Sequence, residues 1–473
     1  MLFPTVEYAL FFLVVLSVAW SLYRLPRVHK GFLLLVSYAF YGFWNWTFLP
    51  LLIGISIFAG VVAALIQRST SPGKRKAWLV VGVTVCLTAL GYFKYTSFLL
   101  TNLLTFWGWF APSPRIPITS PLLPLGISFF VFHAISLLAD CYRGKVTQPV
   151  RLGDALLYVA FFPQLIAGPI LRASRFLPQL AVPRNPHAIR INRAFLLIVG
   201  GLFKKVVISN MLATRLVDPV FSVPQSFSAG DTLLAIYGYA AQIYCDFSGY
   251  TDIAIGCALL LGFRLPRNFN APYKATTPQE FWRRWHISLS SWMRDYLYFP
   301  LGGSRKGYLR TGFNLMVTML LGGLWHGAAW TFVAWGGLHG LLLVAYGIWS
   351  RSTWHELIAL HNSTAWRWIS RILLFHVVCV GWVFFRAPDL KIVFDVFGRL
   401  AAPGPISLAS APVCIVLFLG LAGQYTPSRW RNAFEIELGR WPALTRGAAL
   451  AMAITLIEIL GPTGVAPFIY FRF

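Results

Sequence analysis

A histidine within an uncharged stretch of forty residues is the first candidate for chemistry. His326 lies in the sequence Gly-Gly-Leu-Trp-His-Gly, and residues 311–350 contain no Asp, Glu, Lys or Arg. An ionisable side chain is costly to bury in a membrane unless it is paired or used, so such residues are functional candidates. Histidine titrates near neutral pH and therefore suits the role of a general base. The alternative is a histidine that only forms a hydrogen bond between packed helices.

A second polar group lies in a basic, tryptophan-rich segment. Residues 278–303 contain His286 and the neighbouring pair Arg294 and Asp295. These side chains either face a substrate or belong to an amphipathic helix at the membrane surface, and Asp295 alternatively forms a local ion pair with Arg294. A single helix that starts near residue 278 is predicted, with one stripe formed by Trp285, Ser288, Leu289 and Trp292.

Two carboxylates interrupt the apolar segment 231–262. Asp246 and Asp252 are six residues apart, so they lie on different faces of a straight helix and do not form a paired acid and base. Asp246, near Tyr244, either lines a cavity or pairs with an arginine of 264–310.

His339 follows His326 by thirteen residues. On one straight helix the two side chains would point about 140° apart, which argues against a shared metal site. None of the six cysteines has the spacing of a metal site, and no phosphate-binding loop or nucleophile elbow is present. The sequence therefore predicts no metal.

These side chains must be positioned by membrane helices. The chain is 57% hydrophobic and 12% charged, whereas soluble domains carry about 25% charged residues. We expect an all-α polytopic membrane protein with about eleven to thirteen transmembrane or re-entrant helices, forming one integral-membrane domain over 1–473. Forty helical residues would span about 60 Å, twice the bilayer core, so 311–350 must be two helices. The glycines at 322, 323 and 327 are the expected break.

Basic residues cluster between the apolar segments. The net charge is +25, and segment 264–310 alone has nine Lys or Arg against two acids. The positive-inside rule and anionic lipid headgroups explain most of this charge without nucleic acid. They place the basic linkers in the cytoplasm, at 24–30, 68–76, 143–151, 172–193, 264–310 and 426–446. Segment 152–171 is then expected to be re-entrant, and segment 5–23 to be a first membrane helix instead of a cleaved signal peptide.

Together these stretches resemble the membrane-bound O-acyltransferase superfamily, particularly its bacterial alginate O-acetyltransferase branch with relatives that acetylate cellulose and peptidoglycan. The similarity runs in order along most of the chain, is most recognisable in 121–386 and is weakest in 387–460. One departure, Phe299, is an ordinary packing change. The similar motifs are Tyr92–Tyr95, Leu123–Phe129, Phe162–Pro169, Tyr244–Tyr250, Phe281–Gly303, Met319–Ala328, Gly381–Arg386 and Pro467–Phe471.

The resemblance implies a ring of helices around a central tunnel. His326 matches the catalytic histidine of the family and would act as general base, and His286 matches a second recurrent histidine. No serine or cysteine is near His326 in the sequence, which favours direct transfer over an acyl-enzyme. Backbone amides at the glycine break or Trp325 are candidate oxyanion donors. Expected channel residues are Trp325, Tyr244, Asp246, Trp285, Arg294, Asp295 and His339.

The resemblance also implies an O-acetyltransferase of the bacterial inner membrane. It would take acetyl from a cytoplasmic donor, acetyl-CoA by resemblance, with no permanently bound cofactor. The acetyl group would pass through the membrane to an extracytoplasmic polysaccharide or a partner acetyltransferase, in exopolysaccharide acetylation of the alginate or cellulose type. The alternatives are a membrane component of peptidoglycan acetylation, a transporter or channel that relays protons, and a scaffold of an export complex.

Overall fold

The computed structural model describes residues 3–110, 121–166, 168–352, 363–462 and 469. Within these ranges the regular structure is entirely helical, which confirms the all-α class. The contacts divide the chain into two compact units, Met1–Arg190 with Cys257–Pro266, and Ile191–Gly256 with Arg267–Phe473. Of the C-terminal motif Pro467–Phe471, only Ile469 is among the described residues.

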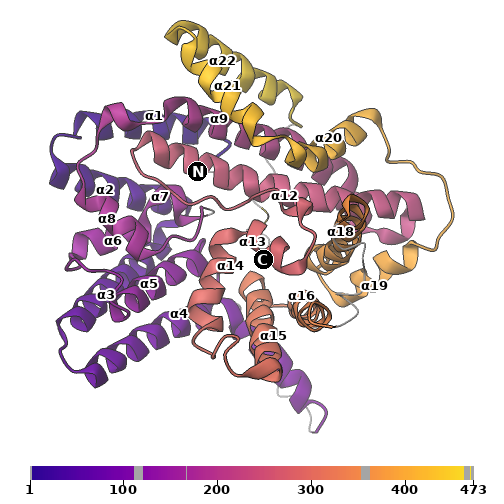
Figure 1. The fold of residues 1–473 in the computed structure, drawn as a ribbon, viewed down its shortest axis with the longest axis horizontal. Coiled ribbons are helices and arrows are strands. Elements are labelled where there is room, and N and C mark those ends of the chain that lie inside the picture. The colour runs from indigo at the N-terminus through magenta and orange to yellow at the C-terminus, as the bar shows by residue number, and fades with distance from the viewer. Residues whose placement is uncertain (1–2, 111–120, 167, 353–362, 463–468, 470–473) are drawn as a thin grey trace. The chain divides into compact units, whose positions relative to one another are not determined.

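The first unit is built around a helix that is buried on all sides. This helix, α5, is apolar at most positions, as expected for a helix without a solvent face, and it also buries His133, Ser136 and Asp140. It packs against α3, α4, α6 and α8, which surround it in Figure 1. The helices of this unit are α1 Val6–Ser21, α2 Pro26–Asn45, α3 Leu49–Arg68, α4 Pro72–Trp107, α5 Ile127–Tyr142, α6 Leu152–Ala160, α7 Phe162–Leu165 and α8 Ala173–Ala181.

The second unit carries all of the candidate site residues. Its long helix α12 ends in a last turn, from Cys257, that belongs to the first unit. Short helices α13 and α14 follow, and α15, α16 and α18 pack in succession (Figure 1). The principal helices are α9 Ile191–Leu202, α12 Ala229–Leu260, α13 Pro278–Arg284, α14 Ile287–Met293, α15 Gly307–His326, α16 Trp330–Trp349, α18 Thr364–Arg386, α19 Leu390–Arg399, α20 Ala411–Ala422, α21 Ser428–Arg440 and α22 Ala443–Leu460.

Several helical stretches are long and apolar enough to cross a membrane. The described residues contain six, or seven if α20 and α21, which meet at 94°, count as one broken span. The higher number expected from the sequence included shorter apolar helices such as α1 and α5. The predicted re-entrant segment 152–171 breaks at Phe161, and the nine residues of α6 reach only about 14 Å, half of a bilayer core. The six stretches are Pro26–Arg68, Pro72–Trp107, Ile191–Ser222, Trp330–Trp349, Thr364–Arg386 and Ala443–Leu460.

The uncharged stretch 311–350 forms two helices, as predicted, and of the three glycines expected at the break only Gly327 lies in it. Helix α15 continues through residues 322 and 323 and ends at His326, and Gly327 adopts an extended conformation before α16 begins at Trp330. A Cβ atom on Gly323 would lie 2.2 Å from the Phe332 carbonyl oxygen, and one on Gly336 would lie 2.4 Å from that of Met319. These glycines therefore let the two antiparallel helices approach closely, and they bring α16 against His326.

Candidate active site

His326 lies at the end of α15 inside an enclosure of aromatic rings. The residue is 3% exposed. Its imidazole makes edge contacts with the rings of Trp325, Trp335 and Phe385, each with ring centroids 5.0 Å apart. Phe385 comes from α18, so three helices meet at this histidine. The surroundings exclude bulk water from the ring, which suits a base that must take its proton from a bound hydroxyl.

Polar atoms without partners lie in the same aromatic cluster. Trp282 Nε1, Trp335 Nε1 and His339 Nε2 are buried and form no hydrogen bond within the described part of the chain, and the rings of Trp282 and His339 both contact that of Trp335. Leaving such a group unsatisfied costs about 1–3 kcal/mol, so a cluster of them requires an explanation. A bound substrate that accepts these hydrogen bonds would supply one.

Trp335 connects the two histidines of this region. Its ring centroid lies 5.0 Å from that of His326 and 4.9 Å from that of His339. The estimate of 140° between the histidines assumed one straight helix, and the break after His326 removes that assumption. The described residues contain no group of three or more His, Cys, Asp or Glu that could hold a metal ion.

His286 lies at a break between α13 and α14, so the single helix predicted from residue 278 is wrong. The break is required by a φ of +40° at His286, a left-handed conformation that is rare outside glycine and clusters at functional sites. The side chain is completely buried, and burial lowers the pKa of His286 to about 3. The ring is therefore neutral at physiological pH.

The tautomer of His286 follows from its hydrogen bonds. Its Nδ1 lies 3.2 Å from Asn268 Oδ1, which also accepts hydrogen bonds from the backbone N–H and the hydroxyl of Ser288. The two Ser288 donors show that the Asn268 atom in this position is the amide oxygen, which only accepts hydrogen bonds. His286 Nδ1 must therefore carry the hydrogen. Nε2 then holds a lone pair and has no partner among the described residues. The ring also lies near Trp325, with centroids 6.0 Å apart.

Trp285 belongs to an aromatic layer that leads toward the His326 enclosure. It is 1% exposed and packs against Trp382, with centroids 4.8 Å apart. Trp382 in turn stacks on Trp335 at 6.2 Å and donates a hydrogen bond to the Tyr273 hydroxyl. Trp335 and Trp282 were not predicted as site residues. The spacing of Trp335 and His339, four residues apart on one helix face, is the signal that could have found Trp335.

Asp246 is held in a buried ion pair with Lys205. It also accepts hydrogen bonds from Ser209 Oγ at 3.3 Å and from the backbone N–H of Ile469 at 3.1 Å. Asp252 forms a more exposed ion pair with Lys204, which lies over the ring of Tyr244. The partners are therefore adjacent lysines of the π-helical segment Phe203–Ser209, and not the arginine of 264–310 that the sequence suggested.

Arg294 and Asp295 form the local ion pair that was one of the two sequence interpretations. Arg294 Nε donates to Asp295 Oδ1 at 2.8 Å. The Arg294 side chain is 57% exposed, whereas that of Asp295 is mostly buried. The structure thus groups His326, Trp325 and His339 in one aromatic cluster with Trp285 and His286, and it assigns Asp246 and Asp295 to ion pairs.

Comparisons with known proteins give a consistent result. Residues 87–386 match the sequence model of MBOAT, the membrane-bound O-acyltransferase family. The chain is 36% identical to the probable alginate O-acetylase AlgI of Pseudomonas putida over 98% of its own length and 99% of that protein. It is 38% identical to a peptidoglycan O-acetyltransferase of Helicobacter pylori, over 81% of this chain and 76% of that protein. A teichoic acid D-alanyltransferase of Bacillus subtilis is 29% identical, over 58% of this chain and 71% of that protein.

Proposed function

The chain belongs to the membrane-bound O-acyltransferase family and is a multi-pass membrane O-acyltransferase, and from this premise we propose that it acetylates an extracytoplasmic polysaccharide. The acetyl group comes from acetyl-CoA in the cytoplasm and leaves on the far side of the bacterial inner membrane. The acetyl group passes either directly to an exopolysaccharide of the alginate or cellulose type or to a partner acetyltransferase that completes the transfer. The names of the alginate O-acetylase relatives support an acetyl group and a polysaccharide acceptor.

His326 acts as the general base in this proposal. It removes the proton of the acceptor hydroxyl while the hydroxyl oxygen bonds to the thioester carbonyl carbon. The tetrahedral intermediate collapses as the carbon–sulfur bond breaks. The leaving thiolate takes the proton from the imidazolium, so an O-acetyl ester and a free thiol result and His326 is regenerated.

The observation that carries the proposal is the unpartnered indole N–H of Trp335 beside His326. Acyl transfer places negative charge on the carbonyl oxygen, and N–H groups aimed at that oxygen stabilise the transition state. Trp335 Nε1 is buried, lacks a partner and belongs to a ring in contact with His326. We assign it the oxyanion role that sequence analysis gave to Trp325 or to backbone amides. His286 Nε2 offers a second lone pair, suited to accepting a hydrogen bond from a substrate donor other than the proton that His326 removes.

Peptidoglycan is the second candidate acceptor. The Helicobacter pylori relative favours it, because that protein is named a peptidoglycan O-acetyltransferase and is as similar over the shared region as several alginate relatives. Both acceptors are extracytoplasmic polysaccharides, and both present a hydroxyl to the same base. Assays with both acceptors would separate them.

Acetyl transfer from labelled acetyl-CoA by the purified protein in proteoliposomes tests the proposal. Wild type and His326→Ala are compared with an extracytoplasmic partner and candidate polysaccharides present. Label should reach the acceptor only with wild type, while His326→Ala inserts and purifies normally. Equal transfer by both proteins would remove His326 from the chemistry. No transfer by either well-folded protein, with every acceptor, would favour a transporter or scaffold.

A further inference from the structure

An open groove in the first unit is formed by three segments that are far apart in the sequence. Its walls are the first turn of α2, the chain that leads into α6 and the end of α8, and its volume is about 750 Å³. Helix α6 packs against both α2 and α8, which lie beside it in Figure 1. Apart from Asp154, the lining residues belong to the basic linkers 24–30, 143–151 and 172–193, for which the sequence predicted a cytoplasmic position. This prediction places the groove at the cytoplasmic surface of the membrane.

The groove carries positive charge that the protein does not neutralise. Its charged lining residues are Arg27, Lys30, Arg151 and Asp154. Lys30 Nζ donates to Asp154 Oδ1 at 2.7 Å, so these two charges neutralise each other. Arg27 and Arg151 are exposed and form no ion pair within the described ranges. Two guanidinium groups are therefore available to bind an anion.

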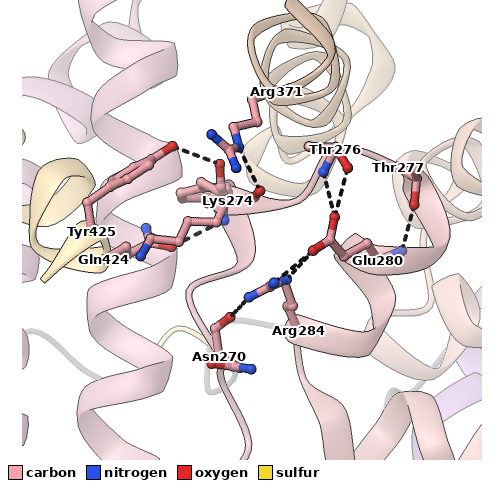
Figure 2. A network of polar contacts seen from close by, with 10 residues as sticks. Asn270, Lys274, Thr276, Thr277, Glu280, Arg284, Arg371, Gln424 and Tyr425 are labelled. Carbon is pink, nitrogen blue, oxygen red and sulfur yellow. Dashed lines mark hydrogen bonds and ion pairs between the residues drawn. The ribbon is translucent and has the colours of Figure 1, made fainter. Parts of the chain in front are cut away.

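Comparable cations of the second unit already have acceptors within the protein. Figure 2 shows Arg284 donating to Glu280, at 2.7 Å. In the same view Arg371 donates to the Lys274 backbone carbonyl oxygen at 3.1 Å. Neither arginine of the groove has such an acceptor among the described residues. A ligand in the groove would therefore not have to displace a protein group from these two side chains.

Hydrogen bonds from side chains outside the groove hold two of its walls. Gln67 of α3 holds the chain before α6, because its Nε2 donates to the Gln148 carbonyl oxygen at 3.1 Å and its Oε1 accepts from the Val150 N–H at 2.9 Å. Beyond α8, Arg184 donates to the Val182 carbonyl oxygen at 2.9 Å. Walls that are already held in place lose less conformational entropy when a ligand binds. The groove is thus a preformed site.

An exposed apolar stripe leads from the groove along α2. Val28 lines the groove, and Val28, Leu35 and Phe43 are each more than half exposed. Gly31 and Ala39 are exposed between them, so the stripe has a residue at every third or fourth position, as one face of a helix requires. A Cβ atom added at Gly31 would meet nothing within 4 Å, so the stripe is open at this point. The stripe starts in the first turn of a stretch that is long and apolar enough to cross a membrane, so it faces lipid chains.

We propose that this groove binds an anionic phospholipid of the cytoplasmic leaflet. The lipid phosphate accepts hydrogen bonds from Arg27 and Arg151, because the planar guanidinium group matches the geometry of phosphate oxygens. One acyl chain lies along the stripe from Val28 to Phe43. Basic pockets between membrane helices on the cytoplasmic side bind anionic headgroups in this way, whereas the amine of a zwitterionic headgroup is repelled by the two arginines. The bound lipid holds α2, α6 and α8 together at the membrane surface.

Native mass spectrometry of the full-length protein in detergent tests the headgroup contact, with phosphatidylglycerol and phosphatidylcholine titrated separately. Each cation near a membrane surface contributes about fivefold to the affinity for an anionic lipid, so wild type should prefer phosphatidylglycerol about twentyfold. Arg27→Gln/Arg151→Gln should reduce this preference to less than about twofold. Lys74→Gln/Lys76→Gln removes the same charge from two exposed lysines of linker 68–76 and should bind as wild type does. No preference in wild type, a preference retained without the arginines, or equal losses in both double variants would overturn the proposal.

A larger side chain at Gly31 separates a lipid from a soluble phosphate. The added side chain of Gly31→Leu enters open space, so the melting temperature in lipid-free detergent should not fall, but it occupies the path of the acyl chain. Affinity for phosphatidylglycerol should fall about tenfold, as for the loss of roughly two buried CH₂ groups, and Gly54→Leu, at an exposed glycine of α3 with equally open surroundings, should bind as wild type does. Wild-type affinity in Gly31→Leu would overturn the proposal even if the arginine variant fails to fold. Glycerol 3-phosphate that binds as tightly as phosphatidylglycerol would show a site for soluble phosphates and would also overturn it.

Discussion

The imidazole of His326 and the indole of Trp335 meet edge to face, with ring centroids 5.0 Å apart, across the break between α15 and α16. The contact depends on the close approach of the two helices at Gly323 and Gly336. The indole Nε1 is buried beside the proposed base and has no partner in the described structure. This arrangement supplies a base and a potential oxyanion donor from neighbouring helices.

Replacing Trp335 by phenylalanine should lower kcat and leave the fold intact. Trp335→Phe keeps most of the ring but removes the N–H, and loss of one oxyanion donor costs about 10²–10³ in kcat. The KM should change little, because the donor acts mainly in the transition state. Steady-state acetyl transfer measures both constants.

Trp382→Phe is the matched control. Its Nε1 already donates to the Tyr273 hydroxyl at 3.1 Å, so it is not available to a substrate. Trp382→Phe should lower the melting temperature, and it should leave kcat close to the wild-type value. Wild-type kcat in Trp335→Phe, or an equal loss of kcat in both variants, would contradict the oxyanion role.

A methyl group at Gly336 should separate α15 from α16. The added Cβ of Gly336→Ala would lie 2.4 Å from the Met319 carbonyl oxygen, so the helices must shift. Overpacking of this kind costs about 1–3 kcal/mol, and it should also reduce acetyl transfer because it moves Trp335 relative to His326. Gly347→Ala is the control in the same helix, because nothing lies within 4 Å of its added Cβ. Equal thermal stability and activity of the two variants would contradict this account.

The sequence predicted the features that depend on local pattern. An uncharged stretch too long for one span required a break, and the structure has one directly after His326. The glycines at 322 and 323 were expected to be part of the break, and glycine is a poor helix former. They lie within α15 instead, where Gly323 serves the close packing of a neighbouring helix. Helix propensity alone cannot distinguish a glycine that ends a helix from a glycine that permits close packing of a neighbouring helix.

Features that depend on distant segments were not predicted. Pairing with an arginine was one of two interpretations of Asp246, but Lys205, forty-one residues earlier in the chain, is its partner. The helix break at His286 interrupts a sequence with no glycine or proline at that point. Asn268 stabilises the break by accepting hydrogen bonds from His286 and Ser288. The Lys205–Asp246 pair and the hydrogen bonds of Asn268 are both determined by tertiary structure, so they cannot be predicted from local patterns in a single sequence.

Removing one member of the Lys205–Asp246 pair should destabilise the protein far more than removing both members. Lys205→Met or Asp246→Leu alone leaves a buried charge uncompensated, which costs about 3–5 kcal/mol. The double variant removes both charges and should recover much of that loss. Thermal unfolding in detergent of wild type, the two single variants and the double variant gives the coupling free energy between the two side chains. Additive losses in the double variant would show that the pair is not the source of the effect.

Stability should fall in acid partly through His286. Burial lowers the pKa of this side chain to about 3, below the value of about 6.5 in an unfolded chain. Between these values the unfolded state binds a proton that the folded state does not, so stability is full above pH 6.5 and declines toward pH 3. The slope from one group is at most about 1.4 kcal/mol per pH unit. Melting temperatures between pH 7.5 and 4.5 should fall less steeply in His286→Asn, which tolerates the left-handed backbone. The control His187→Asn, at an exposed histidine, should follow wild type; parallel curves for all three proteins would show that His286 does not resist protonation in the fold.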